Sequence, residues 1–179
     1  MNSKKIVITG GPGTGKSTLI NHLIKNGHTC LEEISRQVTL DAQKKGTSQL
    51  FLTEPLLFSE LLLKGRIRQF EQSNYLKSDF IFFDRGVPDV LAYMNYIGDT
   101  YPQYFIDACK KAVYDTVFIL KPWKEIYVSD NERYESFKQA EEIHDHLLST
   151  YQHYNYNLID VPFGTIEYRT NFILNALKQ

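Results

Sequence analysis

The sequence predicts an α/β protein in which a mostly parallel sheet of about five strands lies between two layers of helices, with a small helical lid. Apolar runs of strand length alternate along the chain with longer segments of helical periodicity. The first of these runs leads through a glycine-rich loop into a helix, the order expected of a strand and its crossover helix. At 179 residues the chain is expected to form a single domain, residues 1–179.

The expected elements follow from these runs in chain order. Residues 4–9 contain a β-branched run and predict a buried strand. Residues 16–25 have helical spacing up to Asn26 and Gly27, which end the helix. The remaining elements are a weak strand at 29–33, helices at 34–45 and 55–75, a strand at 79–84, helices at 88–96 and 102–113, a strand at 115–120, a helix at 131–151, a strand at 156–161 and a helix at 165–177. The loops after parallel strands meet at one edge of the sheet, where we expect the site.

The loop after the first strand matches a phosphate-binding pattern. Residues 10–18, Gly-Gly-Pro-Gly-Thr-Gly-Lys-Ser-Thr, fit G-x-x-x-x-G-K-[ST], the phosphate-binding loop (P-loop) of NTPases. Backbone N–H groups and the following helix N-terminus cradle phosphates, Lys16 lies beside the β- and γ-phosphates, and Ser17 ligates Mg²⁺. The expected cofactors are therefore ATP and Mg²⁺. The expected nucleotide-binding residues are Gly11, Gly13, Thr14, Gly15, Lys16, Ser17 and Thr18.

Composition narrows the class of protein further. The chain is 42% hydrophobic and 23% charged, as in ordinary soluble domains, and its net charge of −1 argues against broad nucleic-acid or membrane-surface binding. No apolar run is long enough to span a bilayer, and the N-terminus leads straight into the first strand, so we expect no signal peptide. Cys30 and Cys109 fit no metal spacing. We interpret them as reduced, mostly buried thiols of a cytoplasmic protein.

Asp84 and Arg85 end the third expected strand. A carboxylate after an apolar strand can hold Mg²⁺ or accept a proton from a substrate hydroxyl, and the alternative is a cap of the next helix. The guanidinium group of Arg85 would lie beside the phosphates, or form a structural ion pair with Asp89. Glu32 and Glu33 end the second expected strand at the same edge. One of them, preferably Glu33, should point into the cleft as a base for the acceptor hydroxyl, the alternative being a solvated pair.

Further arginines and aromatic residues are candidates with open alternatives. Arg36 would contact substrate or pair with Glu33. In the expected lid, residues 121–140, Arg133 lies in the first turn of a helix capped by Ser129 or Asp130, and is expected either to offset charge on the transferring phosphoryl group or to form a surface ion pair.

Trp123, in the same lid, either covers a ligand ring or anchors the loop. His144 and His146 point to different sides of a helix and do not predict a metal site. The tyrosine-rich segment 151–156 is interpreted as a half-buried joint between a helix and a strand. The direction of Arg66 and Arg68 is left open by the periodicity.

Four segments, residues 10–18, 33–36, 83–89 and 130–133, together resemble the small AAA-type P-loop ATPase family related to the kinase domain of NadR, which phosphorylates nicotinamide riboside. The layout is also similar to that of deoxynucleoside and thymidylate kinases, in which an Asp-Arg pair ends the third strand and an arginine-bearing lid follows. The resemblance implies a three-layer α/β/α P-loop NTPase fold. The Asp-Arg step, in place of the Asp-Glu pair of hydrolysing motors, favours transfer to a bound acceptor.

These observations support three hypotheses. The first is an ATP- and Mg²⁺-dependent kinase for a nucleoside-like or other small hydroxyl acceptor, with Lys16, Glu33, Asp84, Arg85 and Arg133 in catalysis and Ser17 and Asp84 at the metal. The second is a nucleotide-dependent switch or slow NTPase that binds a protein or lipid partner. The third is a nucleotide-binding domain whose chemistry has decayed. ATP is favoured over GTP because the chain has no Asn-Lys-x-Asp motif. The acceptor and the oligomeric state stay open.

Overall fold

The structure is a computed structural model that describes residues 3–44, 46–47, 49–127 and 136–178. Its strands are β1 (Lys4–Gly10), β2 (Thr29–Leu31), β3 (Phe80–Asp84), β4 (Thr116–Leu120) and β5 (Leu158–Val161). Its helices are α1 (Lys16–Lys25), α2 (Ser35–Lys44), α3 (Leu50–Thr53), α4 (Pro55–Ser73), α5 (Pro88–Ile97), α6 (Gln103–Lys111), the 3₁₀ helix η1 (Lys124–Ile126), α7 (Phe137–His153) and α8 (Ile166–Ala176).

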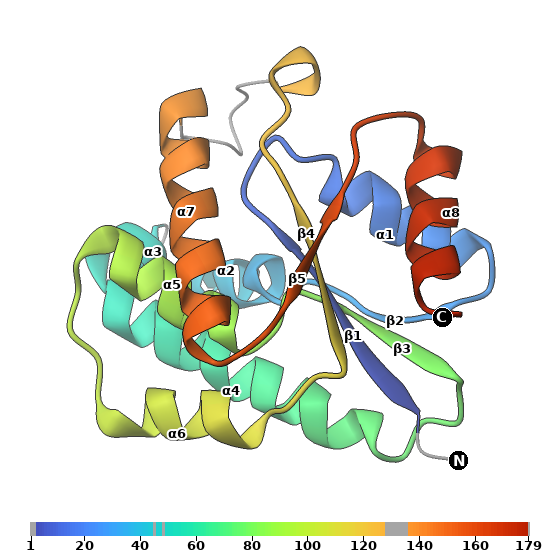
Figure 1. Ribbon diagram of the computed structural model, residues 1–179. Coiled ribbons are helices and arrows are strands. Elements are labelled where there is room, and N and C mark those ends of the chain that lie inside the picture. The colour runs from blue at the N-terminus through green and yellow to red at the C-terminus, as the bar shows by residue number, and fades with distance from the viewer. Residues whose placement is uncertain (1–2, 45, 48, 128–135, 179) are drawn as a thin grey trace.

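The five strands form one parallel sheet in the order β2-β3-β1-β4-β5 (Figure 1). β1 lies at its centre, with Ile8 in register with Asp84 on one side and Phe118 on the other. Because all the strands are parallel, they end at the same edge of the sheet, and the loops after β1, β3 and β4 meet there. The predicted α/β/α fold with about five parallel strands is confirmed.

Helices cover both faces of the sheet. α1 and α8 lie together on one face, and α4, α5, α6 and α7 lie on the other (Figure 1). Because side chains alternate along a strand, Ile6 and Ile8 of β1 enter the layer of α1 and α8, whereas Val7 enters the opposite layer. This burial on both sides explains why the central strands read as continuous apolar runs.

The structure contains one helix that the sequence did not predict and moves the start of another. α3 was not expected, because a four-residue helix carries almost no periodic signal. The helix predicted at 131–151 begins instead at Phe137, where Ser136 and Gln139 form a reciprocal capping box. Ser136 is thus the cap of α7, and the predicted caps Ser129 and Asp130 lie outside the described residues.

In the part of the chain that the structure describes, no helix is both long enough and apolar enough to cross a bilayer.

The two cysteines give a first testable prediction. Cys30 on β2 is half-buried and Cys109 on α6 is buried, both are free thiols, and burial raises the pKa of each to about 12. At pH 8 only about one thiol in 10⁴ would then be ionised, so neither should react with iodoacetamide in the folded protein. Mass spectrometry should find both labelled after unfolding in guanidinium. Rapid labelling of Cys30 without denaturant would contradict this.

Candidate functional site

The loop between β1 and α1 takes a path that depends on glycine. Gly13 and Gly15 have φ angles of 70° and 74°, in the left-handed region. A Cβ atom at Gly13 would lie 2.2 Å from Cδ2 of Tyr127. The hydroxyl group of Thr14 donates to the carbonyl of Gly11 at 3.0 Å and closes the turn. The loop is therefore packed against Tyr127 and closed by a hydrogen bond of its own.

This loop offers unpaired donors. Among the described residues, the backbone N–H groups of Gly13, Thr14 and Gly15 find no acceptor in the protein, and the first N–H groups of α1 follow directly. Ser17 and Thr18 are exposed at the start of the helix. Free N–H groups at a helix N-terminus bind phosphate well, so the loop fits the polyphosphate that the sequence predicted.

Lys16 and Asp84 form a buried ion pair between the start of α1 and the end of β3. Their exposed fractions are 6% and 4%. Burial lowers the pKa of Lys16, and the nearby Arg85 guanidinium lowers it further, against the opposing effect of Asp84. The predicted phosphate-binding lysine and the predicted metal-binding carboxylate are thus direct neighbours.

Glu33 is held by two arginines. One carboxylate oxygen accepts from Nη2 of Arg66 at 2.7 Å and from the backbone N–H groups of Ile34 and Ser35, and the other accepts from Nε of Arg85. Burial alone would raise the pKa of Glu33, but the charges of Arg66 and Arg85 hold it well below its usual range. Glu33 is therefore ionised, whereas Glu32 is exposed, as the preference for Glu33 predicted.

Arg85 occupies a strained position at the end of β3. Its φ angle is 72°, which is unusual for a residue with a side chain. Its Nη1 atom donates to the carbonyl of Gly10 at 2.9 Å and lies 3.5 Å from Oδ1 of Asp89. Burial lowers the pKa of Arg85, but the charge of Glu33 outweighs this and raises it overall. The predicted ion pair with Asp89 is therefore present, and the contact with Gly10 places Arg85 next to the loop, while its predicted position beside the phosphates stays a prediction.

Asp89 fixes the turn between β3 and α5. Its carboxylate accepts from the hydroxyl groups of Thr9 and Tyr151, each at 2.5 Å, and from the N–H of Gly86 at 2.8 Å. Burial, and then the charge of Asp89, raise the pKa of the Tyr151 hydroxyl well above its ordinary value. Tyr151 thereby ties the end of α7 to the site, and the predicted role of segment 151–156 as a packed joint is confirmed.

Arg66 is a site residue whose orientation the sequence left open. It is 3% exposed, and its Nη1 atom donates to the backbone carbonyl of Asp84 at 3.0 Å while Nη2 contacts Glu33. Arg68, two positions further along α4, is exposed. Helical spacing distinguishes the two arginines, because Arg66 lies on the buried side of α4 together with Leu62 and Leu63.

A cavity of about 690 Å³ opens beside these residues. Its polar end is formed by Gly11 and Pro12 of the loop together with Glu33, Arg66, Arg85 and Asp89. Its other walls include Leu40, Phe51, Phe58, Leu62, Val90, Tyr93 and Ile143. Arg36 also lines the cavity and is exposed, which is compatible with the predicted substrate contact. The volume suits a small molecule.

Trp123 anchors the phosphate-binding loop. Its backbone N–H donates to the carbonyl of Gly13 at 3.2 Å, and its ring stacks on Phe163 with the centroids 5.0 Å apart. Of the alternatives for Trp123, the structure therefore supports the anchor. Arg133 and the rest of 128–135 lie outside the described residues, so the catalytic role of Arg133 stays a prediction.

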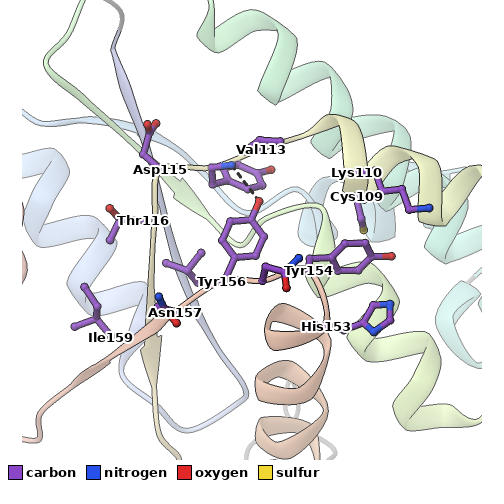
Figure 2. A pocket seen from close by; sticks show the side chains of 13 residues that line it. Cys109, Lys110, Val113, Asp115, Thr116, His153, Tyr154, Tyr156, Asn157 and Ile159 are labelled. Carbon is purple, nitrogen blue, oxygen red and sulfur yellow. Dashed lines mark hydrogen bonds between the residues drawn. The ribbon is translucent and has the colours of Figure 1, made fainter.

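A second cavity, of about 700 Å³, lies at the opposite edge of the sheet, near the beginnings of β4 and β5. Figure 2 shows its lining, with Tyr154 close to Cys109 and the Tyr156 hydroxyl accepting from the backbone N–H of Tyr114 at 3.1 Å. No residue of the phosphate-binding loop contributes to it.

The acidic groups bear on the kind of metal the site can hold. Within the described ranges, no three His, Cys, Asp or Glu side chains are grouped as a metal site. A single carboxylate, Asp84, and a hydroxyl, Ser17, fit a hard cation that takes its remaining ligands from water and phosphate oxygens. The residues present therefore fit Mg²⁺ that arrives with a nucleotide.

Comparison with known proteins defines the family. A family model described as an AAA domain matches residues 5–169, and the chain belongs to this AAA domain family. No curated protein sequence matches the chain significantly.

Solved structures share the fold at low identity. The structure is similar to deoxyadenosine kinase from M. mycoides with dCMP and dCDP, at 18% identity and a TM-score of 0.73 over 97% of this chain and 98% of that one. It is similar to thymidylate kinase from Candida albicans, at 18% identity and a TM-score of 0.72 over 99% and 92% of the chains. It is also similar to NadR protein in complex with NR, at 14% identity and a TM-score of 0.75 over 98% of this chain and 50% of that one.

Proposed function

We propose that this protein transfers the γ-phosphoryl group of ATP to a hydroxyl group of a nucleoside-like small molecule, in a Mg²⁺-dependent reaction. The observation that carries the proposal is the 690 Å³ cavity, because the phosphate-binding loop forms one wall and Glu33 and Arg85 form the adjoining one. An acceptor bound there would meet phosphate and carboxylate at the same place. Positioning of this kind, together with electrostatic stabilisation, supplies almost all of the catalysis of phosphoryl transfer.

Each residue of the site has its own role in phosphoryl transfer. The loop and Lys16 hold the β- and γ-phosphates, and Ser17 and Asp84 would hold Mg²⁺, which neutralises phosphate charge when bound. A bond forms between the acceptor oxygen and the γ-phosphorus, and the bond from that phosphorus to the β-phosphate oxygen breaks. The acceptor proton passes to Glu33 or Asp84 and then to solvent. Because the arginines keep Glu33 ionised, its main task is to orient the hydroxyl.

The walls of the cavity support the class of acceptor. Phe51, Phe58 and Tyr93 add an aromatic surface to the lining of the cavity, next to its charged residues. A flat ring can pack against such a surface while a sugar hydroxyl faces Glu33. The likeness to structures named deoxyadenosine kinase, thymidylate kinase and NadR in complex with NR supports the same class.

The proposed function is tested by measuring ADP formation from Mg-ATP with a panel of nucleosides, ribosides and their monophosphates. We expect ADP only with a matching acceptor, and a loss of about 10²-fold or more in Asp84→Asn. Asp79→Asn, at an exposed aspartate just before β3, is the matched control and should keep full activity. Slow ADP formation that no acceptor changes would instead favour the nucleotide-dependent switch.

A further inference from the structure

Arg169 of α8 lies behind the phosphate-binding loop. It is 2% exposed, and its Nη2 atom donates to the backbone carbonyl of Thr14 at 3.0 Å. Its Nη1 atom is so close to Gly15 that a Cβ atom there would lie 2.8 Å away. The guanidinium group therefore rests directly on the part of the loop where α1 begins.

The charge of Arg169 is not balanced by a carboxylate in the described part of the chain. Its Nε atom is buried and has no hydrogen-bond partner there, and none of the ion pairs of the described residues includes it. Burial is what lowers its pKa. A buried cation without a counter-ion costs free energy. An anion that binds nearby would offset part of this cost, so its binding would be favourable.

The peptide between Thr14 and Gly15 connects this charge to the other side of the loop. It is planar and trans, so its C=O and N–H groups point in opposite directions. Arg169 holds the carbonyl, and the N–H of Gly15 thereby points away from Arg169, where no described residue accepts from it. A charged donor on a carbonyl polarises the amide and makes its N–H a stronger donor.

We infer that Arg169 is a positioning residue for the nucleotide phosphates. It fixes the orientation of the Thr14–Gly15 peptide, and the phosphates in the loop balance its charge. The inference rests on the nucleotide site of the proposed function and adds to it a cation from the far end of the chain, 155 residues after Thr14. Arg169 acts through the backbone and need not touch the nucleotide.

The fold supplies a reporter for this site. Trp123 is the one tryptophan in the sequence, and the guanidinium carbon of Arg169 lies 5.8 Å from the centroid of its ring. Because Trp123 also donates its backbone N–H to Gly13, its fluorescence is expected to respond when the loop is filled.

The test compares Arg169→Met and Arg169→Lys with wild type and with Lys178→Met, an exposed lysine just beyond α8. Binding of Mg-ATP, tripolyphosphate and adenosine is measured by calorimetry and Trp123 fluorescence, and folding by circular dichroism. We expect Arg169→Met to weaken both ATP and tripolyphosphate roughly 10- to 100-fold and to change adenosine binding less than about twofold. Arg169→Lys should recover part of the loss, and Lys178→Met should bind like wild type.

Other outcomes separate the inference from the proposed function. A folded Arg169→Met that binds tripolyphosphate within about twofold of wild type would overturn the positioning role. If Arg169→Met fails to fold, Arg169→Lys carries the test, with a loss expected for tripolyphosphate and none for adenosine. Wild-type protein that binds neither ATP nor tripolyphosphate would contradict the proposed function itself.

Discussion

Lys16→Met is expected to reduce kcat/KM for phosphoryl transfer by about 10²- to 10³-fold. Lys16 is buried at the first turn of α1 and is paired with Asp84, so its charge lies where the β- and γ-phosphates would be held. Methionine keeps much of the volume and removes the charge. Since the charge on the phosphoryl group is redistributed in the transition state, this cation should matter more for catalysis than for the fold.

Lys25→Met is the matched control, because Lys25 lies on the same helix but is exposed. Steady-state kinetics with the identified acceptor should show activity near that of wild type for Lys25→Met. If Lys16→Met keeps kcat/KM within about tenfold of wild type, Lys16 does not stabilise the transferring phosphoryl group.

Arg66→Met is expected to lower the free energy of unfolding by about 2–3 kcal/mol and to reduce activity as well. Arg66 joins two parts of the site that are distant in sequence, because it donates to the carboxylate of Glu33 and to the backbone carbonyl of Asp84. Removing it leaves a half-buried carboxylate with one arginine partner fewer. Glu33, no longer fixed from this side, should then orient the acceptor poorly.

Arg68→Met tests whether the loss comes from this position. Arg68 lies on the same helix with its side chain exposed, and its replacement should change the free energy of unfolding by less than about 0.5 kcal/mol. Urea unfolding followed by circular dichroism measures both variants. Equal midpoints for Arg66→Met and Arg68→Met would show that the buried contacts of Arg66 contribute no net stability.

The sequence was sufficient for the parts of the site that lie at strand ends. The phosphate-binding loop follows β1 directly, and Asp84 and Arg85 follow β3, so the parallel sheet alone brings them together. The preference for Glu33 over Glu32 depended on the same argument. These predictions needed only the alternation of strands and helices and one local motif.

The arginines that support the site could not be predicted in the same way. Arg66 reaches Asp84 across 18 residues, and Arg169 reaches Thr14 across 155. Such contacts depend on how helices pack on the sheet, which the order of elements does not determine. The start of α7 was also misplaced, because Ser129, Asp130 and Ser136 are all residue types that cap helices, and only the structure shows the cap at Ser136.

The position of β1 in the sheet has a consequence for how the protein folds during synthesis. β1 is made before the other strands of the sheet, but Lys4 is in register with Phe80 and Ile6 with Thr116, so neither neighbouring strand exists until much later. The phosphate-binding loop then gains its contact with Arg169 only when α8 has been made. The nucleotide site is thus completed late, and chains cut short before α8 should leave the sheet face that carries Ile6 and Ile8 without its cover from α8.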